Sequence, residues 1–183
     1  PHLDVAALLA LISELELHAI VRPGPHINGE MTYFGLPERV VWDQACQANS
    51  PRGNPVVLPV VPRMFPVPSY ASEAFLDEVQ RWYRAVGEVI APFVHPHGPV
   101  VLAQVDNEGA MYFRDGVYHQ DHHPDAIAKF RDYLRHRYET LDALRSAYDD
   151  EEVRFSDVLP PTQLEPPVSA FVRHLDWAAF QER

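Results

Sequence analysis

Residues 98–109 read Gly-Pro-Val-Val-Leu-Ala-Gln-Val-Asp-Asn-Glu-Gly, an apolar run that leads into three polar residues. The run from 100 to 105 is nearly continuous, which is typical of a parallel strand covered on both faces. Asp106, Asn107 and Glu108 stand at its carboxyl end. Enzymes with parallel sheets carry their chemistry on the loops at this end of the strands. The stretch therefore predicts both a type of sheet and the position of a site.

A second strand and two helices precede this stretch. Residues 18–21 are a short apolar run, and Arg22-Pro23-Gly24-Pro25 ends it with residues that break regular structure. Apolar residues recur at helical spacing over residues 4–16, with Asp4 as the N-cap, and again over residues 72–91. The face of the first helix that we expect to be buried consists of Leu8, Leu11, Ile12 and Leu15.

The rest of the chain divides into one irregular region and three further helices. Residues 27–69 are rich in Pro, Gly and Asn and lack sustained periodicity, which predicts a long excursion with little regular structure. Helical spacing returns over residues 124–138 and, after a Pro-rich link, over residues 168–180. A shorter helix over residues 141–148 is capped by Thr140. The apolar face expected for the last helix consists of Val168, Phe171, Val172 and Leu175.

These elements predict an α/β fold in which parallel strands pack against outer helices. A closed (β/α)8 TIM barrel takes about 250 residues, whereas this chain shows two clear strands in 183 residues. We therefore expect residues 1–183 to form one partial (β/α)8 domain whose barrel is incomplete within this chain. The two strands should be parallel and adjacent, or nearly so.

Composition and charge exclude several classes of partner. The chain has a net charge of -11 and 15 Lys and Arg residues, so it lacks the clustered positive surface that nucleic acids require. No stretch approaches the roughly 18 consecutive apolar residues of a membrane span. The one cysteine, Cys46, excludes an intrachain disulfide and a zinc site built from several thiolates. It favours a reducing compartment, and we expect a cytoplasmic protein.

Each predicted strand is followed by a glutamate, Glu30 after the first strand and Glu108 after the second. Cleavage of a glycosidic bond needs two carboxyl groups, one to protonate the departing oxygen and one to attack or stabilise the sugar carbon. Each glutamate is equally consistent with a solvated loop residue or an N-cap. The two residues alone leave these interpretations open.

A histidine-rich segment offers a second kind of site. Its potential ligands are His119, Asp121, His122, His123 and Asp125. Two imidazoles with a carboxylate can hold zinc, but these residues lack the i, i+4 spacing of a helical zinc motif. A polar loop before the helix at 124–138 explains them without a metal. We therefore expect no metal and no cofactor, and a metal-dependent hydrolase remains an alternative.

Large side chains follow both glutamates closely in the sequence: Tyr33, Phe34, Met111, Tyr112 and Phe113. Aromatic faces in such positions stack on sugar rings, and the same side chains suit a hydrophobic core equally well. The sequence leaves both roles open.

Several segments carry a resemblance to known enzymes. Residues 21–30, Val-Arg-Pro-Gly-Pro-His-Ile-Asn-Gly-Glu, and residues 34–37, Phe-Gly-Leu-Pro, resemble the Arg-Pro-Gly-Pro and Gly-Leu-Pro signature of family 35 β-galactosidases. Residues 98–108 are similar to the second signature of that family, a Gly-Pro, an apolar strand and Gln-Val-Glu-Asn-Glu. Residues 130–138 and 140–144 are closer to family 42 β-galactosidases, which belong to the same barrel clan.

This resemblance implies a role for each matching residue. Glu108 is the general acid/base, and Asn107 hydrogen-bonds the 2-hydroxyl of the sugar. Glu30 binds galactose hydroxyls, with support from Asn28 and Gly29. The resemblance places the nucleophile on a later strand, outside this segment, so that Glu30 is not the nucleophile.

The chain departs from the family 35 pattern at several positions. Asp106 stands where a glutamate is usual, Gly109 where a tyrosine is usual, and Asn28-Gly29 where a Cys-Ala pair is usual. These departures bear on sugar specificity more than on the type of reaction. His26 replaces a tyrosine and either hydrogen-bonds the substrate or lines the loop. Arg22 is either a cation that orients the carboxylates of the site or a buried structural partner.

The resemblance implies retaining hydrolysis of terminal β-D-galactosides, with a galactoside or oligosaccharide as the partner. Glu108 should then have a raised pKa. The carboxyl groups of Glu30 and Glu108 should lie more than about 6 Å apart, because a retaining pair is separated by about 5 to 5.5 Å. The segment by itself should be inactive because its nucleophile lies elsewhere. A noncatalytic carbohydrate-binding barrel is the alternative from a different class.

Overall fold

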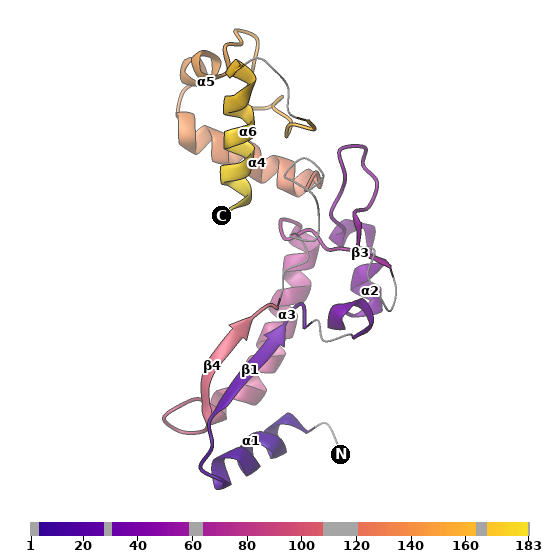
Figure 1. The fold of residues 1–183 in the computed structure, drawn as a ribbon, viewed down its shortest axis with the longest axis vertical. Helices are drawn as coiled ribbons and strands as arrows, with labels where there is room; N and C mark the ends of the chain where they lie inside the picture. Colours follow the sequence, from indigo (N-terminus) through magenta and orange to yellow (C-terminus); the bar gives the residue numbers. More distant parts are fainter. Residues whose placement is uncertain (1–3, 28–30, 59–63, 108–120, 164–167, 183) are drawn as a thin grey trace.

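The computed structural model of the chain describes residues 4–27, 31–58, 64–107, 121–163 and 168–182 (Figure 1). One end of the molecule holds a pair of strands with two helices, and the other end holds three helices. The short elements of the long excursion lie between these ends (Figure 1).

Two parallel strands position the candidate site. Strand β1 (Ala19–Gly24) pairs in parallel with β4 (Val100–Val105), and Gly24 lies opposite Val105. Both strands therefore end at the same edge. The predicted parallel and adjacent arrangement is confirmed.

Two helices accompany this pair. Helix α1 (Val5–Glu14) precedes β1, and α3 (Glu73–Ile90), which ends in the short 3-10 helix η3 (Ala91–Phe93), connects back toward β4. Asp4 caps α1, as predicted, and Ser72 caps α3. In both caps a side-chain oxygen accepts a backbone N–H of the first turn, which satisfies a group that the helix itself leaves unpaired.

The prediction that β4 is covered on both faces is wrong for the described residues. Val101, Leu102 and Val105 are 48, 55 and 68% exposed, and Ile20 of β1 is 65% exposed. An apolar strand of this kind needs neighbours on its faces and edges. The part of the chain that the structure describes contains no third parallel strand, so these side chains lack the neighbouring strands that would cover them.

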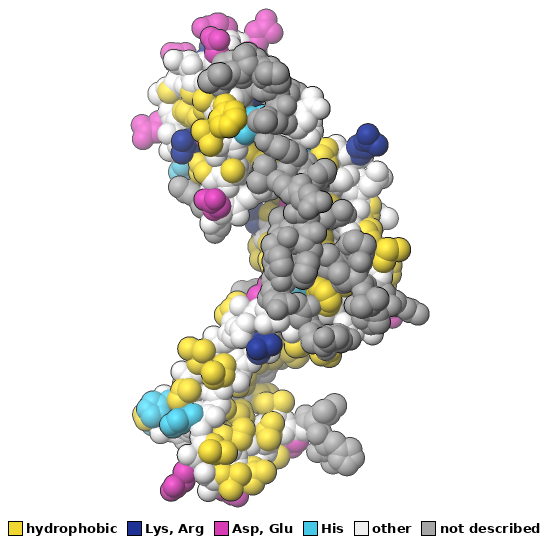
Figure 2. Space-filling model, in the orientation of Figure 1, with side chains coloured by type: hydrophobic (Ala, Val, Ile, Leu, Met, Phe, Trp, Pro, Cys, Tyr) yellow, Lys and Arg dark blue, Asp and Glu magenta, His cyan; other side chains and the backbone are white. Residues whose placement is uncertain are grey.

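The prediction for the apolar face of α1 is wrong for three of its four residues. Leu8, Leu11 and Leu15 are 56, 49 and 60% exposed. Ile12 is partly buried and packs, together with Leu9, in the cluster that contains Ala19 of β1. Figure 2 shows apolar side chains gathered over this end of the molecule. The helical period was identified correctly, but the elements that the remaining face would pack against are not among the described residues.

The long excursion contains only short elements, as predicted, yet it has a core of its own. Phe34 packs edge-to-face on Phe65 with ring centroids 5.3 Å apart, and Phe75 of α3 is buried in the same cluster. The excursion is thereby attached to the beginning of α3. Its elements are η1 (Thr32–Gly35), α2 (Glu38–Val41), η2 (Gln44–Cys46) and the antiparallel strands β2 (Val57–Leu58) and β3 (Phe65–Pro66).

Three helices form the second half of the molecule: α4 (Pro124–Tyr138), α5 (Leu141–Tyr148) and α6 (Val168–Gln181). Thr140 caps α5, as predicted. Phe130, Leu134, Leu144 and Trp177 lie in their shared core. Neither these helices nor any other that the structure describes is long and apolar enough to cross a membrane.

Helix α6 buries only part of the face that was predicted. Val172 packs against the shared core, but Phe171 and Leu175 are 49 and 55% exposed. His174, Asp176 and Trp177 are buried instead. The buried face contains a carboxylate, which accepts hydrogen bonds from Tyr138 and Tyr148 of the neighbouring helices. A pattern of apolar residues alone cannot identify a buried face that is partly polar.

Candidate active site

The turn after β4 is held by the Asp106 side chain. Its Oδ1 accepts the backbone N–H groups of His26 and Asn107, both at 2.9 Å, and its Oδ2 accepts the Tyr70 hydroxyl at 2.8 Å. Asp106 itself has a positive φ of 58°, a backbone conformation that few residues other than glycine adopt. The carboxylate therefore joins the end of β4 to the loop that follows β1.

Burial acts to raise the pKa of Asp106, but its contacts with His26 and Tyr70 outweigh burial, and the pKa lies below its ordinary value. Burial, with the hydrogen bond to Asp106, raises the pKa of the Tyr70 hydroxyl. The pair is therefore an ionised carboxylate with a neutral phenol donating to it.

His26 is fully buried beneath this turn. Its Nδ1 contacts the Tyr70 hydroxyl, and its ring lies 5.6 Å from that of Tyr70. Its Nε2 has no hydrogen-bond partner in the described part of the chain. A side chain with no exposed surface fits the role of lining the loop better than that of binding substrate.

A chain of side-chain hydrogen bonds runs along the edge where both strands end. Arg22 Nε donates to Gln104 Oε1 at 3.1 Å, and Gln104 Nε2 donates to Asn107 Oδ1 at 3.0 Å. Arg22 is exposed, so the interpretation as a buried structural partner is wrong. The structure thus connects two of the predicted site residues, Arg22 and Asn107, through Gln104.

The remaining predicted site residues lie outside the described residues. These are Asn28, Gly29, Glu30 and Glu108, together with Gly109, Met111, Tyr112, Phe113 and His119. Their predicted roles, and the predicted separation of the two glutamate carboxyl groups, stay predictions.

Two contributors were not predicted from the sequence. Gln104 belongs to the quoted motif, but nothing in the motif shows that it bridges Arg22 and Asn107. Tyr70 lies 36 residues from Asp106 in the sequence, in a region without regular periodicity, and no local signal marks it.

Helix α3 fixes the end of β1. The Trp82 indole N–H donates to the Pro23 carbonyl oxygen at 2.6 Å, and the Tyr83 hydroxyl donates to the carbonyl oxygen of Gly24. Burial raises the pKa of Tyr83, and the nearby Asp106 carboxylate adds to the effect. The Pro23 carbonyl oxygen thus accepts from a side chain, and the Gly24 carbonyl oxygen accepts both the Tyr83 hydroxyl and the Asp106 backbone N–H at 2.7 Å.

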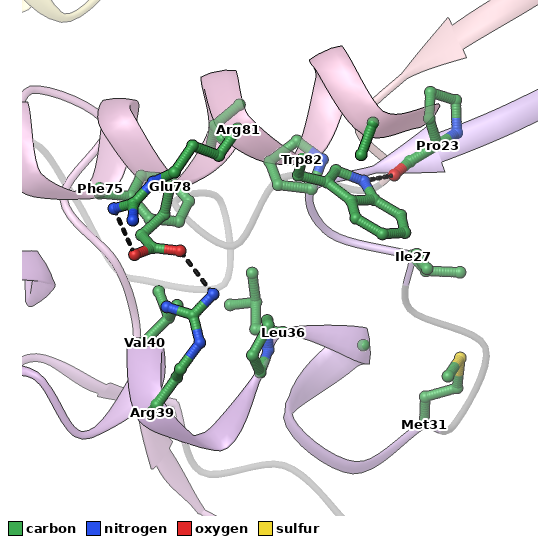
Figure 3. A pocket seen from close by; sticks show the side chains of 15 residues that line it. Pro23, Ile27, Met31, Leu36, Arg39, Val40, Phe75, Glu78, Arg81 and Trp82 are labelled. Atoms are coloured by element: carbon green, nitrogen blue, oxygen red, sulfur yellow. Dashed lines mark hydrogen bonds and ion pairs between the residues drawn. The ribbon is translucent and has the colours of Figure 1, made fainter. Parts of the chain in front are cut away.

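Trp82 and Pro23 also line a cavity of about 510 Å³ (Figure 3). Its walls are mostly apolar and come from the end of β1, the excursion and α3. At one end Glu78 pairs with Arg39 and Arg81, each at 2.6 Å, and the hydrogen bond from Arg39 lowers the pKa of Glu78. None of the residues predicted from the sequence to bind sugar lines this cavity among the described residues.

The described part of the histidine-rich segment has structural roles. Asp121 Oδ1 accepts the backbone N–H groups of Asn49 and His123 at 3.1 and 2.9 Å, and His123 Nδ1 accepts the Asp125 N–H to cap α4. These contacts attach the three-helix half to the excursion. Within the described ranges no group of three His, Cys, Asp or Glu side chains is arranged to hold a metal ion.

The aromatic residues after β1 belong to the core. Tyr33 and Phe34 are each 6% exposed and pack against Phe65. Of the two roles that the sequence left open for them, the structure supports packing.

Comparison with known proteins gives a family and several relatives. The glycoside hydrolase family 42 model, described as "Beta-galactosidase", matches residues 66–183. A β-1,2-glucosyltransferase of Ignavibacterium album is 28% identical over 88% of this chain and 22% of its own length. An exo-β-D-glucosaminidase of Thermococcus kodakarensis is 26% identical over 99% of this chain and 23% of its own length. The human β-galactosidase-1-like protein 2 is 27% identical over 64% of this chain and 15% of its own length.

The fold has a counterpart among solved structures. A β-galactosidase from the psychrophilic Marinomonas ef1 superposes with a TM-score of 0.56 and 17% identity, over 100% of this chain and 32% of that chain. At this identity the likeness concerns the fold alone. The chain spans less than a quarter of the length of the glucosyltransferase and the glucosaminidase that it matches.

The matched model supports family 42 and leaves the family 35 expectation unconfirmed. It includes the second signature at 98–108 as well as the helices from residue 124 onward. The model covers more than half of the chain. The chain belongs to the family 42 β-galactosidases.

Proposed function

We propose that this chain supplies the acid/base half of a retaining glycosidase that cleaves terminal β-D-galactosides. The observation that carries the proposal is the turn after β4, where Asp106 and Gln104 hold Asn107 at the edge shared with β1. A barrel glycosidase places its reacting groups at this edge. Residues 1–183 would then be one part of a (β/α)8 barrel.

The roles of the residues follow from the motif. Glu108 is the general acid/base, Asn107 binds the hydroxyl at sugar C2, and Glu30 binds other hydroxyls with Asn28 and Gly29. The nucleophile is a glutamate on a later strand, outside this segment. Support comes from family membership and from the position of Asn107 in the fold.

The reaction has two steps in this proposal. In the first, the nucleophile attacks the anomeric carbon while Glu108 gives its proton to the leaving oxygen, so that a C–O bond to the aglycone breaks and a glycosyl ester forms. In the second, the Glu108 carboxylate takes a proton from water, which attacks the same carbon and releases the nucleophile. Two inversions leave the β configuration unchanged.

Galactose is the sugar we propose, because the matched family model is described as β-galactosidase and because residues 21–37 carry the galactosidase-like signature. The relatives bear names that refer to glucosyl transfer and to glucosaminides. The identity of the sugar is therefore measured directly with three glycosides.

The test uses the full-length protein with the 4-nitrophenyl β-glycosides of galactose, glucose and glucosamine. We expect the galactoside to have the highest kcat/KM, and proton NMR should show the β-anomer of the free sugar first. Residues 1–183 alone serve as a matched control and should release no nitrophenol. The α-anomer as first product would contradict retention. Release from none of the three glycosides, with sugar binding preserved, would favour a noncatalytic barrel.

A further inference from the structure

The hydrogen-bond chain from Arg22 through Gln104 to Asn107 can run in only one direction. A guanidinium group has donors and no acceptor, so the atom that Gln104 turns toward Arg22 must be its oxygen, 3.1 Å from Nε. The Gln104 NH2 group therefore faces Asn107, and the Asn107 atom 3.0 Å away must be its oxygen. Arg22 thus fixes the orientation of two amide groups in succession.

This orientation decides what Asn107 offers to a ligand. Its oxygen accepts from Gln104, and its backbone N–H is held by Asp106 Oδ1. Its amide nitrogen has no acceptor among the residues that the structure describes. The side chain is partly exposed at the edge where both strands end. Asn107 therefore presents two N–H donors there, while Gln104 takes one of the two lone pairs of its oxygen.

We propose that Arg22 and Gln104 act as positioning residues that make Asn107 select a hydroxyl over an ammonium group at C2 of the sugar. The inference rests on the proposed function, which places sugar C2 at Asn107. A hydroxyl oxygen accepts from the Asn107 amide, whereas an ammonium group can only donate and would face a second donor. A sugar amine of ordinary basicity, with a pKa of about 7.7 to 8 like that of an α-amino group, is an ammonium ion at pH 6.

The test is Gln104→Glu in the full-length protein. This substitution keeps the size of the side chain, but a carboxylate has no donor, so it accepts from both Arg22 and the Asn107 NH2 group. Asn107 must then turn its oxygen toward the sugar. The measurement is the ratio of kcat/KM for a 4-nitrophenyl β-D-galactoside to that for its 2-amino-2-deoxy analogue at pH 6.

We expect this ratio to fall by about tenfold or more in Gln104→Glu. The change corresponds to about one hydrogen bond between Asn107 and the group at C2, which the turned amide gains with the ammonium and loses as a donor to the hydroxyl. The intrinsic reactivity of each glycoside is the same for both proteins, so the change in the ratio reports the site alone. Raising the pH from 6 to 9 should lower the wild-type ratio, because the neutral amine accepts a hydrogen bond.

Two further variants complete the design. Arg22→Met removes the donor that orients the Gln104 amide and should lower the ratio by about threefold. This variant replaces Gln104→Glu as the test if Gln104→Glu does not fold. Arg84→Gln changes an exposed arginine of α3 and should leave the ratio unchanged.

The outcomes separate the inference from the proposed function. If Asn107→Ala changes the ratio but Gln104→Glu and Arg22→Met do not, the inference is overturned and the proposed function stands. If Asn107→Ala also leaves the ratio unchanged, C2 does not lie at Asn107, and both are overturned. A fall of the ratio in Gln104→Glu, absent in Arg84→Gln, supports the inference.

Discussion

Asp106 links three segments of the chain through one carboxylate, and the titration of this group should be visible in stability. Its pKa is lowered in the folded state. A depressed pKa contributes stability that is present above the unfolded value of about 3.9 and is lost as the pH falls through the folded value. The wild-type free energy of unfolding should therefore decrease between pH 6 and pH 3.

Asp106→Asn should remove part of that decrease, because an amide does not take up the proton. Urea unfolding at pH 6 and at pH 3 measures the difference for both proteins. Asp132→Asn, at an exposed carboxylate of α4, is the matched control. An acid-induced loss of the same size in Asp106→Asn and wild type would show that this carboxylate is not the responsible group.

Glu30 provides a second test at a single residue. We expect Glu30→Gly to weaken the preference for galactose over glucose while the covalent step survives, because Glu30 is proposed to bind hydroxyls. Azide should therefore not restore activity as a glycosyl azide of inverted configuration. Isolation of that azide would identify Glu30 as the nucleophile and would show that the role carried over from the resemblance is wrong.

Among the elements, the beginnings of the helices were the most predictable feature. Asp4 and Thr140 are caps in the structure as in the sequence interpretation, because a cap depends on the few residues around it. The buried faces were less predictable. Leu8 of α1 and Leu102 of β4 are exposed because burial depends on neighbours that a local pattern does not contain.

The Ser72 cap should contribute more stability than the Thr140 cap. Ser72 Oγ accepts the Phe75 N–H at 3.1 Å and also donates to the Ala45 carbonyl oxygen at 2.7 Å, in a fully buried position. Ser72→Ala leaves both groups without a partner and should cost about 2 to 3 kcal/mol. Thr140→Ala removes one exposed cap and should cost about 1 kcal/mol.

Urea unfolding measures the free energy of unfolding of Ser72→Ala and Thr140→Ala. The m-values of both variants should equal that of the wild type. Equal losses would mean that the contact between Ser72 and the excursion adds nothing to the cap.

At the scale of the whole molecule, Asp176 holds the three-helix half together. It is fully buried on α6, where its carboxylate accepts from Tyr138 at 2.7 Å and from Tyr148 at 3.0 Å and lies 2.8 Å from Arg137 Nε. Burial raises its pKa despite these partners. The side chain therefore has partners on both α4 and α5.

Asp176→Ala should cost about 3 kcal/mol, because it removes the shared acceptor of two tyrosine hydroxyls and the carboxylate that pairs with Arg137. Asp132→Ala removes an exposed ion pair with Arg135 and should change stability by less than about 0.5 kcal/mol. The free energy of unfolding of both variants is the measurement. Similar values for the two would show that the buried cluster does not join the helices.

The parts of the candidate site that lie within one segment of the sequence were predictable, whereas the contacts between distant segments were not. The two strand ends, and the positions of Arg22 and Asn107 at them, were predictable because each lies next to an apolar run. Tyr70 and the bridging role of Gln104 depend on contacts between segments 36 and 82 residues apart, which no spacing rule contains. The contacts of Gln104 also orient Asn107, so the sequence indicated where Asn107 lies but not its orientation.

Whether Glu108 is the general acid is decided by the leaving-group dependence of Glu108→Gln in the full-length protein. The measurement is kcat/KM, which reports the first step, for methyl β-D-galactoside and for 2,4-dinitrophenyl β-D-galactoside. We predict a loss of about 10²- to 10⁴-fold for the methyl glycoside, whose alkoxide needs a proton, and little loss for the dinitrophenyl glycoside, whose leaving group does not. An equal loss for both glycosides would contradict the acid role of Glu108.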